Sequence, residues 1–536
     1  MNTSGRLSLS WINKGRSLVS DGTGGYEWVD RDDFRVTETR LLRDAAVVGE
    51  VREDARRAED NLLITGDSGD ALRALTRLPE FADVYRGRVK LVYIDPPFNT
   101  GQAFEHYDDG LEHSVWLTMM RDRLLLIREL LDESGSVWVH LDDAEMAYCK
   151  VLMDEIFGRR NFISTIIWKR RNDPRNTAQY LSGDHDSMLV FAKNIDALTF
   201  NKLPRTEAMD SAYTNPDDDA RGPWRRGDLA ARNYYSKGMY PVLTPGGRRI
   251  TGPPSGSYWR VSEEELTRLD GEGRIYWGPD GMSRPYLKRY LTEVTQGRIP
   301  SSVWHPEEVG FVRNGKEEIR ALMGDVFATP KPERLLRQVL TIASSPGDIV
   351  LDCFAGSGTT AATAHKLGRR WVTVEREPET ADRFVRPRLE KVVDGSDGGG
   401  ISQSAGWREG GGFRHLEVGP SMYEDVAGRV LLAPWVRGDA FTAAARAQLP
   451  GFAPDPEAEA PFAGRKGRQR LAVVDGLVTE STVRSIVGAL ADDERVLIVA
   501  KSYLREAAGL LESLSPGSRL KKAPRDLLDM EGRVLR

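Results

Sequence analysis

The feature that most constrains this 536-residue chain is an alternation of apolar strand patterns with amphipathic helix patterns, interrupted once. The strand patterns occur at 61–65, 90–95, 136–142, 162–168, 187–193, 348–352 and 370–375. Strands that alternate with helices predict an α/β fold around a parallel sheet. We therefore expect one sheet, made by residues 61–200 and 326–394 and interrupted by an irregular insertion at 201–325.

The flanking segments have different patterns. Residues 1–60 are polar and of mixed charge, and we interpret them as an N-terminal arm that wraps around another body. Residues 395–412 are rich in glycine, which is typical of a linker. Beyond them, residues 413–536 hold two strand patterns, at 471–476 and 496–501, that flank a helix. They predict a small C-terminal α/β domain, available for contact with a partner or a second copy.

Charge and cysteine content narrow the class of protein. The chain has 75 Lys and Arg against 80 Asp and Glu, a net charge of −5, so binding to nucleic acid requires a locally basic face. Two cysteines, Cys149 and Cys353, are too few for a disulfide framework. His140 and His185 lack metal-ligand spacing, and we interpret both as structural. No stretch resembles a signal core or a membrane span. We expect a cytoplasmic protein without metal or membrane contact.

A glycine loop, in the sequence DIVLDCFAGSGTTAA, includes and follows the strand pattern at 348–352. Gly356 and Gly358 stand between a strand and a helix, where glycine lets a ligand approach the backbone N–H groups at the helix start. Glu375 closes the next strand, where a carboxylate can accept both hydroxyls of a ribose. The loop lacks the Lys of a triphosphate-binding P-loop. It predicts a nucleoside-bearing cofactor, either a dinucleotide or a methyl donor. A tight strand-to-helix turn without a ligand is the alternative.

A second candidate motif, YIDPPFNTG, ends the strand pattern at 90–95. Asp95 and the carbonyl group of Pro96 present two acceptors, because Pro96 and Pro97 restrict the backbone and carry no N–H donor. Such acceptors suit an exocyclic amine, and Phe98 can lie flat on the attached base. The motif predicts an amine held with its lone pair out of the ring plane, ready to attack an electrophilic methyl group. Among cofactors, it therefore favours the methyl donor.

The insertion carries a local excess of positive charge. From 221 to 260, eight basic residues stand against one acid, Asp228, which gives 8 − 1 = +7. The basic residues are Arg221, Arg225, Arg226, Arg232, Lys237, Arg248, Arg249 and Arg260. The interleaved aromatic residues are Trp224, Tyr234, Tyr235, Tyr240, Tyr258 and Trp259. We expect Arg225, Arg226, Arg248 and Arg249 to contact nucleic-acid phosphates and the aromatic rings to supply stacking surfaces. A solvated surface loop is the alternative.

DPPF at 95–98 followed by FAGSGTT at 354–360 resembles the β class of amino-directed DNA methyltransferases. Over about residues 60–394 the motif order resembles more closely the Mod subunits of type III restriction-modification systems and their orphan relatives. The resemblance implies a Rossmann-like S-adenosylmethionine-dependent methyltransferase sheet, with the insertion as its target-recognition region. Two positions depart from the family pattern, Cys353 where Pro is common and Phe98 where Tyr is more usual.

The resemblance also implies roles for single residues. TPKPERLLRQVL at 329–340 resembles the motif before the glycine loop, so Lys331 and Pro332 would lie over the cofactor. ITGD at 64–67 resembles the element whose acid, here Asp67, reaches the adenine end of the cofactor. The implied catalytic residues are Asp95, Pro96, Pro97 and Phe98. The implied cofactor-binding residues are Asp67, Lys331, Pro332, Asp352, Phe354, Ala355, Gly356, Ser357, Gly358, Thr359, Thr360 and Glu375.

The implied activity is transfer of a methyl group to N6 of adenine in duplex DNA by base flipping, as the modification component of a restriction-modification or phage-defence system. A homodimer and a restriction or helicase subunit are the implied partners. Methylation of cytosine at N4 is the nearest alternative, and an RNA substrate stays open. A NAD-dependent oxidoreductase would use the glycine loop but not DPPF. A non-catalytic DNA-binding subunit would need neither motif.

Overall fold

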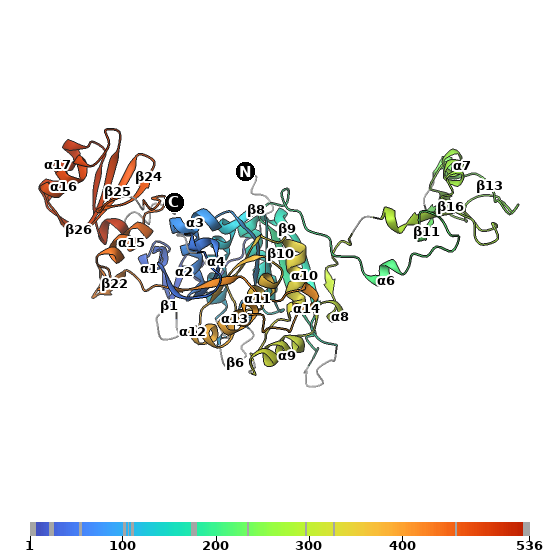
Figure 1. Cartoon of the computed structure of the whole chain (residues 1–536), viewed down its shortest axis with the longest axis horizontal. Coiled ribbons are helices and arrows are strands. Elements are labelled where there is room, and N and C mark those ends of the chain that lie inside the picture. Colours follow the sequence, from blue (N-terminus) through green and yellow to red (C-terminus); the bar gives the residue numbers. More distant parts are fainter. Residues whose placement is uncertain are drawn as a thin grey trace. The chain divides into compact units, whose positions relative to one another are not determined.

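The computed structural model describes residues 7–20, 26–52, 56–99, 112–172, 180–232, 235–294, 297–324, 327–455 and 458–528, and the backbone alone of the strands Ala103–Phe104 and Tyr107–Asp108. The chain forms two compact units, which we describe separately (Figure 1). One consists of Met1–Asn201 together with Ser301–Arg536, and the other of Lys202–Pro300.

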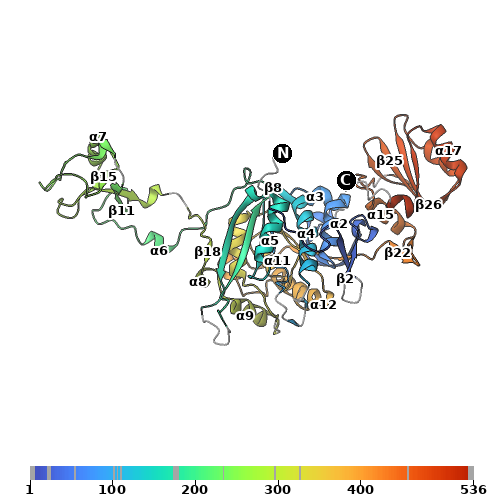
Figure 2. The ribbon, with the colours of Figure 1, turned by 180° about the vertical axis from the view of Figure 1, so that it is seen from behind.

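The first unit is built around a ten-stranded sheet (Figures 1 and 2). Its strands lie in the order β18 (Val303–Trp304), β9 (Phe162–Lys169), β10 (His185–Ala192), β8 (Leu131–Leu141), β5 (Val89–Ile94), β19 (Ile349–Asp352), β20 (Arg370–Glu375), β4 (Asn61–Thr65), β21 (Gly412–Val418) and β3 (Leu42–Gly49). From β8 to β21 every neighbouring pair is parallel. The α/β sheet predicted from the alternation is therefore present, but it is mixed: β10 pairs antiparallel with both β8 and β9, where parallel strands were expected.

Both faces of this sheet are buried, which explains the continuous apolar runs. Leu62 and Ile64 of β4 belong to one core with residues of α2 (Ser68–Arg77), α4 (His113–Leu130) and α5 (Met146–Met153). Leu63, which is also fully buried, points to the opposite face because side chains alternate along a strand. A second group of helices consists of α10 (Glu333–Ala343), α11 (Thr359–Lys366) and α13 (Arg386–Val393). In this group α11 packs against both α10 and α13.

The N-terminal segment packs on its own chain. The Nε1 atom of Trp11 donates to Oγ1 of Thr118 on α4 at 2.8 Å, and Lys14 pairs with Glu155 at 2.7 Å. Strand β3 then forms one edge of the large sheet. The described residues between 7 and 60 thus pack on the α/β unit of their own chain, and the interpretation of this segment as an arm around another body is wrong for them.

The glycine-rich segment 395–412 is also packed and not a free linker. It contains the short helix α14 (Ser402–Ala405), and the side chains of Asp397 and Ile401 are buried. Strand β21 begins at its last residue and pairs in parallel with β4, so the large sheet continues to Val418. The glycines of this segment allow close packing. Amino-acid composition alone does not distinguish such a packed segment from a flexible linker.

The C-terminal region forms a smaller sheet of its own. Its strands are β24 (Phe462–Lys466), β25 (Gln469–Val478), β26 (Arg495–Tyr503) and β27 (Arg519–Lys522), in that order. Both predicted strands fall inside β25 and β26, which are parallel. Helices α16 (Glu480–Gly488) and α17 (Arg505–Leu514) share an apolar core with them.

The second unit is mostly antiparallel. A sheet of β11 (Trp224–Asp228), β17 (Tyr286–Tyr290) and β16 (Ile275–Tyr276) accompanies helix α7 (Glu263–Gly271). The unit ends at Pro300, whereas the predicted insertion ran to 325. The difference arises because β18 pairs with β9 in the large sheet and α9 (Val312–Met323) packs near α13. Within the described parts of the chain, no helix is long and apolar enough to cross a membrane.

The placement of β21 in the large sheet gives a test of the fold. Leu416→Ala removes a fully buried side chain of β21 and should cost about 2–5 kcal/mol of unfolding free energy. Leu431→Ala, in the hairpin strand Arg429–Leu432 where Leu431 is exposed, should change it by no more than about 0.5 kcal/mol. Urea unfolding followed by circular dichroism measures both. Equal midpoints for the two variants would contradict the assignment of β21 to this sheet.

Candidate active site

A cavity of about 920 Å³ lies in the first unit, where β4, β5, β19 and β20 reach their carboxyl ends. Crevices at this edge of a parallel sheet are the usual ligand sites of α/β folds. The predicted catalytic and cofactor residues that line it are Asp67, Asp95, Pro96, Pro97, Phe98, Lys331, Asp352, Phe354, Ala355, Gly356, Ser357, Thr359, Thr360 and Glu375. The structure thus brings together residues from both halves of the sequence.

Two predicted residues support the cavity without lining it. Pro332 is buried at the N-cap position of α10. Gly358 occupies the N-cap of α11 with φ +74°, and a Cβ atom there would lie 3.1 Å from Val385. A side chain at position 358 would therefore disturb the turn that aims the loop at the cavity.

The glycine loop and Glu375 are joined by hydrogen bonds. The amide of Gly356, at φ +53°, donates to Oε2 of Glu375 at 2.9 Å, and the amide of Glu377 donates to Oε1 at 3.1 Å. Each carboxylate oxygen keeps a further lone pair for a ligand hydroxyl. Burial raises the pKa of Glu375 to about 7, against these two amide hydrogen bonds.

Two more acids lie at strand ends. Asp352 is buried at the end of β19 and accepts the amide of Phe354 at 3.0 Å. Burial raises the pKa of Asp352 to about 8, and the carboxylates of Asp95 and Glu375 act in the same direction. Asp67 caps α2, and its Oδ2 accepts from Nη2 of Arg123 at 2.7 Å. Burial opposes the charge on Asp67, but Arg123 and the helix amides lower its pKa overall.

The carboxylate of Asp95 is held on one side only. Its Oδ2 atom accepts from Nζ of Lys331 at 2.6 Å, an ion pair between the two halves of the sheet. Its Oδ1 atom is buried, and no described residue donates to it. A buried acceptor without a partner is costly, so this atom suits the N–H of a ligand. Lys331, implied to lie over the cofactor, also contacts the group implied to be catalytic.

Aromatic groups fix the rest of the DPPF motif. The Nε1 atom of Trp116 donates to the carbonyl of Pro97 at 2.7 Å. The Phe98 ring stacks with His140, with centroids 6.0 Å apart and planes at 22°, and Nζ of Lys331 lies 4.9 Å from its centroid. The last residues of the quoted motif, Thr100 and Gly101, lie outside the described residues.

His140 sits behind Phe98 as a structural residue. Its Nδ1 atom pairs with the hydroxyl of Tyr93 at 2.8 Å, and its Nε2 atom with Asp186 at 3.3 Å. Burial lowers the pKa of His140, and nearby Lys331 acts in the same direction. Among the residues that the structure describes, no group of three or more His, Cys, Asp or Glu could hold a metal ion.

Sequence reasoning missed the residues that support the site from neighbouring helices. Arg123 and Trp116 lie on α4, and no sequence motif marks them. Glu333 is the first residue of α10, where an acid is ordinary, so no sequence signal marks it although its side chain is buried.

The four arginines predicted to contact phosphates are exposed, whereas several aromatic residues of the second unit are not. Arg225 and Arg226 lie on β11, and the Arg226 guanidinium stands 5.2 Å from the ring centroid of Tyr276. Arg248 and Arg249 lie before and in the short strand Arg249–Ile250. All four predicted DNA contacts, Arg225, Arg226, Arg248 and Arg249, are exposed.

The expectation of a fully aromatic stacking surface is wrong for three residues. Trp224, Tyr240 and Trp259 are buried and fill the cores of this unit. Tyr235 and Tyr258 are more accessible and pair edge to face, with centroids 5.7 Å apart. Tyr234 lies outside the described residues.

The sequence model of the DNA methylase family N6_N4_Mtase matches residues 89–386 of the chain. The StyLTI Mod subunit, a type III restriction-modification enzyme subunit of Salmonella typhimurium, is 34% identical over 337 residues, which cover 56% of this chain and 49% of that protein. For the probable type III HindVI Mod subunit of Haemophilus influenzae the identity is 28% over 446 residues, 72% of this chain and 57% of that protein. The chain thus spans about half the length of these relatives.

Two solved structures are more distant. The cytosine-N4-specific PvuII DNA methyltransferase shares 15% identity at a TM-score of 0.34, covering 65% of this chain and 90% of that one. M1.HpyAVI in complex with S-adenosylmethionine shares 14% identity at a TM-score of 0.29, covering 61% and 98%. These TM-scores are too low to bear on the fold.

The two buried acids predict a pH dependence of stability. The pKa of Asp352 rises from 3.8 to about 8, and that of Glu375 from 4.5 to about 7. The folded chain then keeps protons that the unfolded chain has released, so the free energy of unfolding should fall as pH rises through this range. Asp352→Asn should make the melting temperature fall less than that of the unaltered protein from roughly pH 5 to 8. Parallel curves for the two proteins would show that Asp352 does not hold this proton.

Proposed function

Since the chain belongs to the DNA methylase family, whose model matches more than half of it, we propose that it is a site-specific, S-adenosylmethionine-dependent DNA methyltransferase. Its target would be N6 of adenine in duplex DNA. The observation that carries the proposal is Oδ1 of Asp95, a buried acceptor without a described partner, in the same cavity as the glycine loop. One site can therefore receive a base amine and a nucleoside cofactor together.

The cofactor residues fit S-adenosylmethionine. Glu375 can accept the ribose hydroxyls, because both of its oxygens keep free lone pairs, and Asp67 stands beside the end of β4 for the adenine. When bound, S-adenosylmethionine supplies an electrophilic methyl group on a sulfonium centre.

The chain's own residues would orient the base. The target must leave the duplex, because its amine cannot otherwise reach Asp95. Oδ1 of Asp95 would accept one N–H while Lys331 keeps Oδ2 engaged, and Phe98 would stack on the ring. The nitrogen would form its bond to the methyl carbon as the carbon–sulfur bond breaks, and its released proton would pass to Oδ1 of Asp95, which holds that N–H, and from there to solvent. S-adenosylhomocysteine is the second product, and no covalent enzyme intermediate is required.

Alternatives differ in how well they use the site. Cytosine methylated at N4 would use the same acceptors and stays the alternative substrate. A NAD-dependent oxidoreductase leaves Asp95 and Phe98 without a role, and family membership opposes it. The unit Lys202–Pro300 would select the DNA sequence, while its exposed arginines would hold the phosphates of the duplex. A homodimer stays a prediction, and a restriction or helicase subunit gains support only from the names of the type III relatives.

Catalysis and cofactor binding should separate in two variants. Asp95→Ala removes the acceptor for the amine, so methyl transfer to a duplex containing the target should fall by about 100-fold or more while S-adenosylmethionine still binds. Glu375→Ala should instead weaken S-adenosylmethionine binding by on the order of 1.5–3 kcal/mol. Methyl-transfer assays and calorimetric titration measure the two quantities. Asp143→Ala, an exposed acid that does not line the cavity, is the control. Near-normal turnover of Asp95→Ala would refute the proposed catalytic motif.

DNA binding should depend on the second unit through charge. Replacing Arg225, Arg226, Arg248 and Arg249 singly with Gln should weaken binding to every duplex, because phosphate contacts carry no sequence information. Each lost contact should reduce the slope of log affinity against log salt by about one unit. Arg268→Gln is the matched control, since Arg268 is exposed on the same unit but paired with Glu265. Unchanged salt slopes in all four variants would place the DNA contacts elsewhere.

A further inference from the structure

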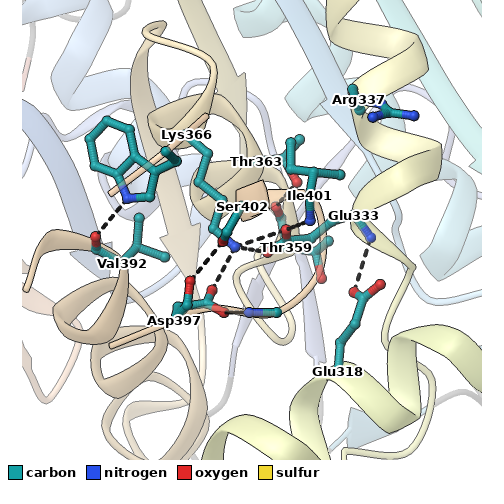
Figure 3. Close-up of polar contacts among 12 residues, drawn as sticks. Glu318, Glu333, Arg337, Thr359, Thr363, Lys366, Val392, Asp397, Ile401 and Ser402 are labelled. Atoms are coloured by element: carbon teal, nitrogen blue, oxygen red, sulfur yellow. Dashed lines mark hydrogen bonds and ion pairs between the residues drawn. The ribbon is translucent and has the colours of Figure 1, made fainter. Parts of the chain in front are cut away.

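A cluster of buried charges lies beneath the glycine loop (Figure 3). Its members are Glu333, Lys366, Arg388 and Asp397, two cations and two anions whose side chains are at most 5% exposed. Nζ of Lys366 donates to both oxygens of Glu333 at 2.9 Å and lies 2.6 Å from Oδ2 of Asp397. Nη2 of Arg388 donates to Oε1 of Glu333 at 2.9 Å. Buried charges persist only when they are paired and hydrogen-bonded in this way.

The cluster reaches the cavity through Arg388. Its Nη1 atom donates to Oγ1 of Thr359 at 2.8 Å and to the carbonyl of Ser357 at 3.3 Å. Both Ser357 and Thr359 line the cavity. Oγ1 of Thr359 also donates to the carbonyl of Lys331 at 3.2 Å, and Lys331 holds Asp95. One guanidinium group thus connects the buried charges with the two loops that shape the site.

The glycine-rich segment closes the cluster from the other side (Figure 3). The amide of Ile401 donates to Oε2 of Glu333 at 2.9 Å, and Asp397 comes from the same segment. Gly400 has φ +54°, and a Cβ atom there would lie only 2.1 Å from Oε2 of Glu333. Each oxygen of Glu333 therefore accepts two hydrogen bonds, which leaves the carboxylate a single orientation. Arg388 and this segment lie beyond residue 386, where the family match ends.

We propose that Glu333, Lys366, Arg388 and Asp397 are positioning residues of the cofactor site, and that the segment around Gly400 is the brace that keeps Arg388 against Ser357 and Thr359. The ligand named here rests on the proposed function. Folding stability alone does not require these buried ion pairs, because well-packed apolar side chains often stabilise a fold as much as a buried ion pair does. A planar guanidinium with several donors, in contrast, can fix two loop atoms at once.

The first test displaces Glu333 without changing any charge. Gly400→Ala places a methyl group against Oε2 of Glu333, whereas Gly398→Ala, two residues earlier, adds one where no atom lies within 4 Å. Gly400→Ala should weaken S-adenosylmethionine binding by about tenfold, raise its KM in parallel, and leave kcat at saturating cofactor within about threefold. Gly398→Ala should match the unaltered protein. Calorimetric titration, methyl-transfer kinetics and thermal melting without ligand supply the readouts.

The second test concerns the contact itself. Arg388→Lys keeps a cation beside Glu333 but lacks the fork that reaches Thr359, and Thr359→Val removes the hydroxyl at nearly constant shape. If the contact positions the loop, the two losses of S-adenosylmethionine affinity should not add in the double variant. Arg337→Met is the control, because Nη1 of Arg337 contacts Oγ of Ser404 in the same segment but lies apart from the loop contacts.

The outcomes separate this inference from the proposed function. An unaltered protein that does not bind S-adenosylmethionine would refute the proposed function. An unaltered protein that binds it, while Gly400→Ala and Arg388→Lys melt earlier but bind it equally well, would show a purely structural cluster and overturn the inference. If Gly400→Ala fails to fold, the cycle of Arg388→Lys and Thr359→Val decides alone. Additive or absent effects on affinity in that cycle would overturn the inference as well.

Discussion

The candidate site depends on the parallel alignment of β4, β5, β19 and β20, whose carboxyl ends meet at one edge of a sheet buried on both faces. Four acids, Asp67, Asp95, Asp352 and Glu375, follow or end these strands and therefore converge on one cavity. Burial raises the pKa of Asp352 and of Glu375; the carboxylates of Asp95 and Glu375 add to the effect on Asp352, and that of Glu377 adds to the effect on Glu375. Such a convergence of acids is stabilised by protons that the buried acids keep and by cations beside the others.

Most of the internal compensation comes from residues remote in sequence. Arg123 of α4 neutralises Asp67, and Lys331 neutralises one oxygen of Asp95 across the two halves of the sheet. The contact between Lys331 and Asp95 ties the DPPF motif to the strand-and-helix half that carries the glycine loop. The second unit separates the two halves in sequence, but the sheet brings their residues together at one cavity.

The strands of the large sheet and most residues that line the cavity could be predicted from the sequence. Both depend on local signals, namely apolar runs for the strands and the motifs that follow the strand ends for the cavity. The sequence did not predict that residues 395–412 are packed, since a glycine that fits against Glu333 and a glycine that confers flexibility have the same composition. Nor did it separate Trp224 and Trp259, which form the core of the second unit, from aromatic residues at a surface. The two-residue strand β18 is too short to give a periodic signal, so the boundary of the insertion was placed too late. Residue roles in the site stay predictions until the variants are measured.

The hydrogen bonds of the glycine loop also bear on which cofactor the site prefers. A dinucleotide would place its pyrophosphate on the N–H groups of this loop at the start of α11. Here the amide of Gly356 already donates to Oε2 of Glu375, and the amide of Phe354 donates to Oδ1 of Asp352. A pyrophosphate at this place would compete with two protein carboxyl groups for these amides. A ligand that offers hydroxyls to Glu375 and a positive centre to the neighbouring acids meets no such conflict. In the sequence, the glycine loop is compatible with both a dinucleotide and a methyl donor. The hydrogen bonds of the loop in the structure favour the cationic methyl donor.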